Sequence, residues 1–238
     1  MKRIDRLALR GFMVGSLIGD GSIPTQRYTT PKCRYSEGHS AEFGEYMRWK
    51  ADFIAQALPV TYTIGERKDP RNGSVYINFV TTTSKFFWKL RNIFYQPDGK
   101  RQMPFEFVEK YFNELALAVL FMDDGNLEFS STGLFKTAEI YTMSYQYDEV
   151  VWFRDFIEKR FGLNFSVRTR RNKYHFLSLG VHEKIKKFID IIKPHIHESM
   201  YYKAYFDYRR VDPAASFRHP PIKIGYDEYI VRLLMKKN

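Results

Sequence analysis

The chain has 238 residues, 44% hydrophobic and 17% aromatic, enough for one large domain or two halves of about 100 residues each. A net charge of +11 indicates a polyanionic partner such as nucleic acid. The single Cys33 excludes an intramolecular disulfide framework and fits a reducing compartment. No signal peptide is visible, and the longest apolar run, Leu115–Met122, is too short to cross a bilayer, so a soluble intracellular protein is expected.

The predicted elements form two cycles, each ordered helix, two strands, helix, two strands, helix. The elements expected in the first cycle are a helix up to Gly21, strands within 27–35, a helix over 42–58, a hairpin of 60–66 with 75–82, and a helix over 84–95. Those expected in the second are a helix from 104 to 124, strands at 127–131 and 135–144, a helix over 147–161, a hairpin of 165–170 with 174–180, and a helix over 182–192. Residues beyond 205 have no counterpart in the first cycle and read as an irregular arm followed by a short basic amphipathic helix.

Each cycle begins with an apolar helix that ends in an acid and a glycine. In the first, Gly11, Gly15 and Gly19 share one face, where each glycine weakens the helix by roughly 1 kcal/mol relative to alanine. Close approach of a second backbone would compensate for that loss. The expected partner is the second motif helix, 117–125, with large side chains packed over the glycines; the candidates are Leu115, Val119 and Met122.

If these two helices run side by side in parallel, Asp20 and Asp124 meet at one end, and two such carboxylates bind a divalent metal. The sequence repeats elsewhere too: Asp52–Ile54 follows Asp20 by 32 positions (52 − 20), and the same tripeptide at Asp155–Ile157 follows Asp124 by 31 (155 − 124). The repeat indicates a fused pseudo-dimer with an approximate two-fold axis.

The second motif closely resembles the LAGLIDADG signature of homing endonucleases, with Leu117, Ala118, Leu120, Asp124 and Gly125 in place. The first is looser, matching at Gly15, Asp20 and Gly21. The resemblance covers residues 7–205 and is closest to the monomeric two-motif branch. It implies an α+β fold of tandem αββαββα halves, 1–103 and 104–205, with an extension at 206–238, two central helices and an antiparallel β-saddle for the DNA major groove.

The resemblance also implies a site-specific enzyme that makes double-strand breaks in a long DNA target with Mg²⁺, which Mn²⁺ can replace. Asp20 and Asp124 would hold the metals, helped by the backbone carbonyls of Gly19 and Asp123. Independently, phosphodiester hydrolysis needs charge neutralisation and an activated water, which clustered metals supply. The side chain of Asp123 points about 100° away from that of Asp124, so it is expected to pack or face solvent.

The family also places basic and polar residues around the metals. Lys203 falls at the family's lysine position in the second half, and the first-half counterpart is Arg101, with Lys100 as its alternative because arginine cannot act as a base. Glu37 and Asn172 are the candidates for ordering water. Because a two-stranded ribbon fits the major groove, the expected DNA contacts lie on strands and turns. These candidates are Arg27, Lys32, Arg34, Arg67, Lys68, Arg71, Lys136, Thr137, Glu139, Tyr141, Ser166, Arg168, Arg170, Arg171 and Lys173.

Other functions stay open at this point. A LAGLIDADG protein that does not cleave would assist intron RNA splicing or regulate DNA, and an RNA endonuclease is a third reading. Retention of both motif acids favours cleavage, since a pure binder has no use for two carboxylates that repel phosphate. An intein is not expected, because Asn238 follows a lysine and not the histidine that splicing chemistry normally uses. A metal site at His195 and His197 is not expected either, because no third cluster of ligands lies nearby in the sequence. A low asparagine content favours a bacterial or phage host over an organelle.

Overall fold

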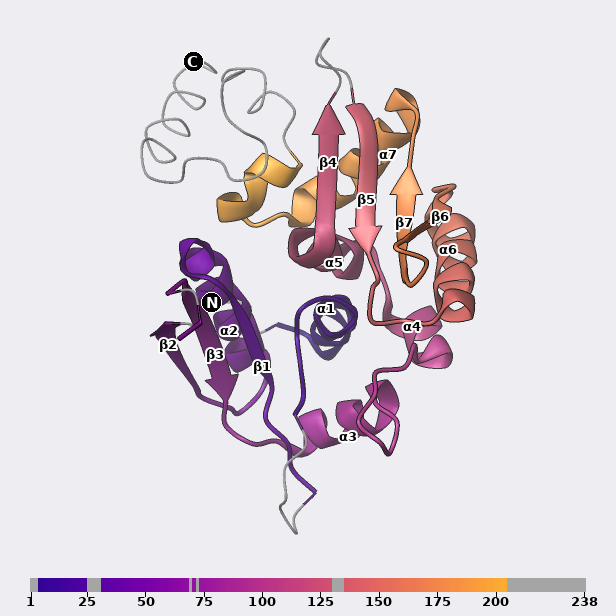
Figure 1. Cartoon of the computed structure of the whole chain (residues 1–238). Coiled ribbons are helices and arrows are strands. Elements are labelled where there is room, and N and C mark those ends of the chain that lie inside the picture. Colours follow the sequence, from indigo (N-terminus) through magenta and orange to yellow (C-terminus); the bar gives the residue numbers. More distant parts are fainter. Residues whose placement is uncertain (1–3, 25–30, 69, 72, 130–134, 205–238) are drawn as a thin grey trace. The chain divides into compact units, whose positions relative to one another are not determined.

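A computed structural model describes residues 4–24, 31–68, 70–71, 73–129 and 135–204 (Figure 1). These residues lie in one compact unit, Met1–Ala204. The predicted C-terminal arm and helix, the candidate Arg27, and part of the predicted strands within 27–35 lie outside the described residues. No described helix is both long and apolar enough to cross a membrane.

The two cycles appear as two sets of helices and antiparallel strands. The first set contains α1 (Arg6–Ile18), β1 (Ser36–Ser40), a 3₁₀ turn η1 (Ala41–Phe43), α2 (Gly44–Ala57), β2 (Tyr62–Lys68), β3 (Val75–Thr81) and α3 (Lys85–Phe94). The second contains α4 (Phe105–Tyr111), α5 (Glu114–Asp124), β4 (Gly125–Phe129), β5 (Phe135–Tyr141), α6 (Tyr147–Phe161), β6 (Ser166–Arg170), β7 (Tyr174–Leu179), α7 (His182–Ile192), η2 (Lys193–His195) and η3 (Glu198–Lys203).

The strands form two sheets, ordered β1-β3-β2 and β4-β5-β7-β6, and every pairing is antiparallel. Each sheet buries alternate residues beneath its own helices, such as Phe79 of β3 and Ile140 of β5. This arrangement confirms the predicted α+β fold.

Several predicted boundaries are set by local chemistry. The Asp5 side chain accepts a 2.6 Å hydrogen bond from the Ala8 amide and so starts α1, and Ser84 caps α3 in the same way. Helix α6 stops at Gly162, whose φ of 64° lies in the left-handed region that glycine tolerates.

Two predictions were wrong. The expected helix from 104 to 124 is two helices, because the Asn113 side chain accepts a hydrogen bond from the Ala116 amide and begins α5 afresh. The expected strands within 27–35 also differ, because the described residues 31–35 contain no strand and the first strand, β1, begins at Ser36. The described residues preceding β1 pair with it only through the bridge Ser22↔Ser36.

The two motif helices, α1 and α5, pack side by side between the two sheets (Figure 1). A Cβ atom added to Gly15 would come within 2.3 Å of the Ala116 carbonyl oxygen, so the two backbones touch there, as predicted. The atoms nearest to Gly11 and Gly19 belong to the side chains of Asn113 and Asp123. The glycine face therefore meets Asn113, Ala116 and Asp123 at these points, not the larger side chains that the sequence suggested.

Candidate functional site

The two motif acids follow the paired helices at the same end. Asp20 lies two residues beyond the end of α1, after the capping Gly19, and Asp124 is the last residue of α5. Both line one pocket of about 240 Å³, together with Gly19, Arg101, the last residue of β5, Tyr141, and residues 142–144 that follow it. The Asp20 side chain is 37% exposed, so the pocket is open to a ligand from outside.

The pocket holds more negative charge than its neighbours compensate. Burial raises the pKa of Asp124 to about 7, and repulsion from Asp20 and Asp123 adds to the rise. Lys203 and Arg101 act in the opposite direction without cancelling it. Two close carboxylates in such a field are a fitting place for a divalent cation, which bonds to oxygen ligands and removes the repulsion.

Arg101 and Lys203 each bind the backbone at one helix end. The Arg101 guanidinium donates to the carbonyls of Gly19 (2.7 Å) and Gly21 (2.6 Å). The Lys203 ammonium donates to the carbonyls of Met122 (2.5 Å) and Asp123 (3.3 Å). Both cations thus neutralise the partial negative charge of a helix C-terminus, beside the motif acids.

These contacts bear on two predicted sets of residues. The carbonyls of Gly19 and Asp123, predicted to help hold metal, already accept hydrogen bonds from the two cations, and a carbonyl oxygen retains a second lone pair. Of the two alternatives in the first half, the structure places Arg101 at the pocket and not Lys100. Lys100 is 79% exposed and pairs with Asp98 at 3.1 Å.

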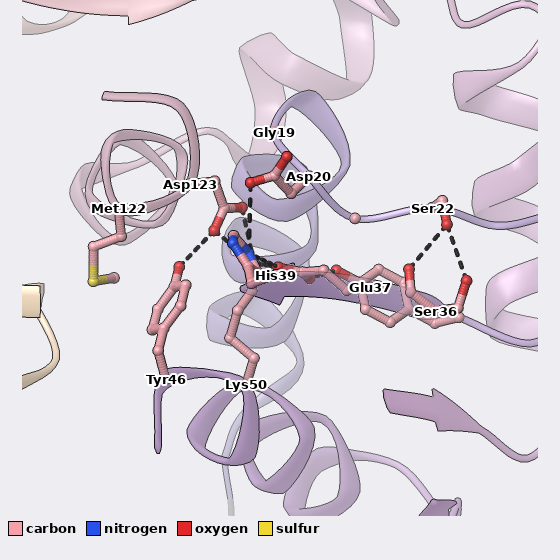
Figure 2. A network of polar contacts seen from close by, with 12 residues as sticks. Gly19, Asp20, Ser22, Ser36, Glu37, His39, Tyr46, Lys50, Met122 and Asp123 are labelled. Carbon is pink, nitrogen blue, oxygen red and sulfur yellow. Dashed lines mark hydrogen bonds and ion pairs between the residues drawn. The ribbon is translucent and has the colours of Figure 1, made fainter. Parts of the chain in front are cut away.

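Behind the pocket lies a buried polar network (Figure 2). Lys50 of α2 is completely buried, and its ammonium lies 2.5 Å from a carboxylate oxygen of Glu37 and 2.8 Å from one of Asp123. The Tyr46 hydroxyl donates to the other oxygen of Asp123 at 2.6 Å, and the Tyr35 hydroxyl donates to Glu37. Of the two expected alternatives for the Asp123 side chain, packing and exposure to solvent, the structure shows packing. This side chain joins the second motif helix to the first half.

One ammonium in this network serves two buried carboxylates. Burial would raise the pKa of Glu37, but Lys50 and His39 outweigh it and lower the pKa to about 2. Burial raises the pKa of Asp123 to about 6, since the negative charges of Glu37 and Asp20 limit what Lys50 can offset. The pKa of Lys50 is raised by the same two acids against the effect of burial.

His39 belongs to the site but was missed from the sequence. Its Nε2 atom lies 3.1 Å from Glu37 and 3.5 Å from Asp20, so the ring connects the buried network with the motif acid (Figure 2). Burial would lower the pKa of His39, but Glu37, Asp123 and Asp20 raise it. The signal was present, because residues two apart on a strand share a face and Glu37 was already a candidate. Glu37 itself is separated from Asp20 by this ring, and its predicted role in ordering water stays a prediction.

In the described part of the chain, one set of His, Cys and acidic residues offers three ligand atoms within 4.8 Å of one another, namely Asp20, His39 and Asp123. Lys50 and Tyr46 already bind the oxygens of Asp123, so this set forms part of the network. His197 instead bonds to Ser199 at 2.8 Å and packs against Trp49.

The buried pair Glu37 and Lys50 has no charged counterpart at the corresponding positions of the second half. Ser22 and Asn126 each lie two residues after a motif acid and pair with Ser36 and Glu139, so Glu37 corresponds to Ile140. The repeated Asp-Phe-Ile tripeptide likewise matches Lys50 with Phe153. Ile140 and Phe153 are fully buried and apolar, so the two halves surround the helix pair with different chemistry.

The predicted DNA-contact residues lie mostly on the outer faces of strands and in turns. The register places Glu139 opposite Ser178 and Ser166, and Tyr141 opposite Phe176 and Arg168, so the two predicted polar rows share one face. Lys136 and Thr137 lie beside Glu128 at the start of β5. The exposed members are Lys32, Arg67, Lys68, Arg71, Lys136, Ser166, Arg168, Arg170, Arg171 and Lys173, whereas Arg34 is half-buried. Asn172 lies in the β6–β7 turn and does not line the pocket, so no contact of the structure supports its predicted role in ordering water.

Comparison with known sequences matches residues 10–188 to the LAGLIDADG DNA endonuclease family. The protein RecA of Mycolicibacterium chitae is 28% identical over 209 residues, 83% of this chain and 47% of the relative, so the chain spans about half the length of the RecA proteins it matches. The intron-encoded endonuclease ai4 of Dictyostelium discoideum is 30% identical over 125 residues, 52% of this chain and 74% of the relative.

Among solved structures, the homing endonuclease I-WcaI bound to its DNA recognition sequence aligns with a TM-score of 0.72 at 20% identity, covering 87% of this chain and 89% of that one. A variant of the homing endonuclease I-DmoI, in complex with its target DNA in the presence of Mg, aligns with a TM-score of 0.53 at 16% identity, covering 79% of this chain and 96% of that one. Both likenesses concern the fold.

Proposed function

Because this chain belongs to the LAGLIDADG DNA endonuclease family, we propose that it is a site-specific homing endonuclease that breaks both strands of a long duplex DNA target. It acts as a monomer and uses the divalent cation Mg²⁺, which Mn²⁺ can replace. The observation that carries the proposal is the pair of carboxylates, Asp20 and Asp124, that two helices bring to one open pocket. The proposal is supported by the similar structures, of which one is bound to its DNA recognition sequence and another is in complex with its target DNA in the presence of Mg.

The residues of the pocket suit a divalent cation. Asp20 and Asp124 would hold it through carboxylate oxygens. Burial, and then repulsion from Asp20 and Asp123, raises the pKa of Asp124, and a bound cation would offset both effects. When bound, such a cation supplies charge neutralisation at the phosphate and a water of lowered pKa. Arg101 and Lys203 keep the helix ends in place and add positive charge where a phosphate would lie.

The two sheets supply the DNA-binding surface in this proposal. Antiparallel strands fit the major groove and can present side chains to base edges. Exposed arginines on β6, Arg168 and Arg170, would reach bases, and the turn residues Arg71, Arg171 and Lys173 would contact phosphates.

The proposal is tested with a library of plasmids that carry random inserts. Incubation with Mg²⁺ should linearise a subset of plasmids that share one long sequence, and EDTA should prevent it. Failure to cut any insert, together with selective binding of structured RNA, would instead support the non-cleaving splicing function.

A further inference from the structure

The outer face of the first sheet carries one amide side chain between two glycines, and we call the space above these glycines the recess. Ile77 and Phe79 of β3 are buried, so Asn78 between them faces outward. The register places Gly38 of β1 and Gly65 of β2 directly beside Asn78. The flanking rows across β1, β3 and β2 are Ser36–Val80–Thr63 and Ser40–Tyr76–Arg67.

The fold does not require glycine at either position. Gly38 and Gly65 are not among the residues with positive φ, so any amino acid could adopt their backbone conformation. A Cβ atom at Gly65 would meet nothing within 4 Å, and one at Gly38 would make ordinary contact with Asn78 at 3.4 Å. Since glycine weakens a strand, its presence on both sides of Asn78 is best explained by something that approaches the sheet closely.

The other half has no such recess. Gly38 corresponds to Tyr141, because each lies two residues beyond the pairing partner of Ser22 or Asn126. The row across that sheet is Tyr141–Phe176–Arg168, whose two rings lie 5.6 Å apart. The Tyr141 hydroxyl also donates to Glu139 at 2.8 Å. Bulky and internally bonded side chains thus occupy the place that Gly38, Asn78 and Gly65 leave open.

The side chain at the centre of the recess suits one base. An asparagine amide offers one donor and one acceptor in the geometry of the N6 and N7 edge of adenine in the major groove. Among the described residues, none forms a hydrogen bond with the Asn78 amide group. Arg67 in the neighbouring row can attract a phosphate and bring the groove to the sheet.

From this geometry we propose that Asn78 reads an adenine in the half-site under the first sheet, and that Gly38 and Gly65 admit the base edge. The inference rests on the proposed function, because it assumes that the sheet lies in the major groove of DNA. It adds a specificity-determining residue and the base that this residue selects.

The test selects bound duplexes from a random DNA library with the full chain in EDTA, where cutting is prevented, and sequences them. The unmodified chain should enrich one long site with a strongly preferred adenine in one half. Asn78→Ala should reduce that preference by about 5- to 150-fold at this single position and leave the others unchanged. Gly65→Val, which keeps the amide but fills the recess, should have the same effect.

Asn92→Ala changes an exposed asparagine on α3 and serves as the matched control, with no effect on any position. A melting curve for each variant confirms that it is folded. If the unmodified chain enriches a site and Asn78→Ala leaves it unchanged, or changes a position that is not adenine, the inference is wrong while the proposed function stands. If the unmodified chain enriches no sequence, both are wrong.

Discussion

Removing the buried ammonium of Lys50 is expected to destabilise the protein strongly. In Lys50→Met, the carboxylates of Glu37 and Asp123 would remain buried without their shared cation. Breaking a buried ion pair in this way costs about 3–5 kcal/mol of unfolding free energy. For a chain of this size, that corresponds to a fall in melting temperature of about 6–20 °C.

Two comparisons separate this effect from simple loss of a lysine. Lys100→Met removes a surface ion pair, since Lys100 is 79% exposed, and should leave the melting temperature unchanged. The triple change Glu37→Gln, Lys50→Met, Asp123→Asn removes all three charges together and should recover most of the loss. The penalty of Lys50→Met should also shrink toward acidic pH, where the orphaned carboxylates take up protons.

The assay is thermal and urea unfolding followed by circular dichroism at pH 7.5. A loss below about 1 kcal/mol in Lys50→Met would show that Lys50 is not the buried partner of the two carboxylates, because a fully buried charge cannot lose its partner at so small a cost. A triple variant less stable than the single one would contradict the same pairing.

Three further outcomes follow from the site and the helix pair. Gly15→Ala should lower the unfolding free energy by about 1–3 kcal/mol, since its new methyl group would lie 2.3 Å from the Ala116 carbonyl oxygen. The control Gly180→Ala, whose methyl group would meet nothing within 4 Å, should not lower it. Equal melting temperatures for the two variants would contradict the close backbone contact at Gly15. The pKa of Asp124 is raised to about 7, so the native state binds more protons than the unfolded chain between about pH 4 and 7, and stability should fall as pH rises through that window. In metal-free buffer at pH 7.5, Asp124→Asn should therefore be more stable by about 2–4 kcal/mol and should lose the stabilisation that Mg²⁺ gives the unmodified chain; no gain in the variant would contradict the unfavourable charge. One DNA strand should be cut faster than the other, because Lys203 can relay a proton through water while Arg101 cannot. The two halves also differ in charge, since residues 1–103 carry a net +8 (17 − 9) and residues 104–238 a net +3 (21 − 18). Arg101→Lys should reduce the difference in rate, and equal single-turnover rates on separately labelled strands of the unmodified enzyme would contradict the asymmetry.

The features that local chemistry decides were predictable from the sequence. The glycines at 11, 15 and 19 predicted a close helix pair. The side chain of Ser84 begins α3, and Gly162 ends α6, as the capping chemistry of these residue types predicts. The break at Asn113 was missed because the apolar pattern continues across it, although an asparagine cap was present to be read.

The buried network could not be predicted, because its partners are distant in sequence. Lysine on an amphipathic helix is normally exposed, and Lys50 meets Asp123 across 73 positions. The helical period places Lys50 on the same face as the buried Tyr46 and Ile54, and Arg48 on the exposed face, but it does not supply the acids that a buried ammonium needs. Those acids, Glu37 and Asp123, come from other elements. Placement of His39 beside Asp20 followed from the strand register once Glu37 was located.

In the proposed function, Asp20 and Asp124 together form a cation-dependent cleavage site at the end of the helix pair. The decisive comparison is between the unmodified chain, Asp20→Asn and Asp124→Asn on the selected duplex site, with cleavage measured in Mg²⁺ and binding measured in EDTA. In EDTA, where no cation is bound, each substitution should leave affinity for the DNA equal or higher, because removal of a negative charge cannot weaken attraction to phosphate. With Mg²⁺, each substitution should abolish double-strand cutting, as the proposed site requires. Full double-strand cutting by either variant would contradict it.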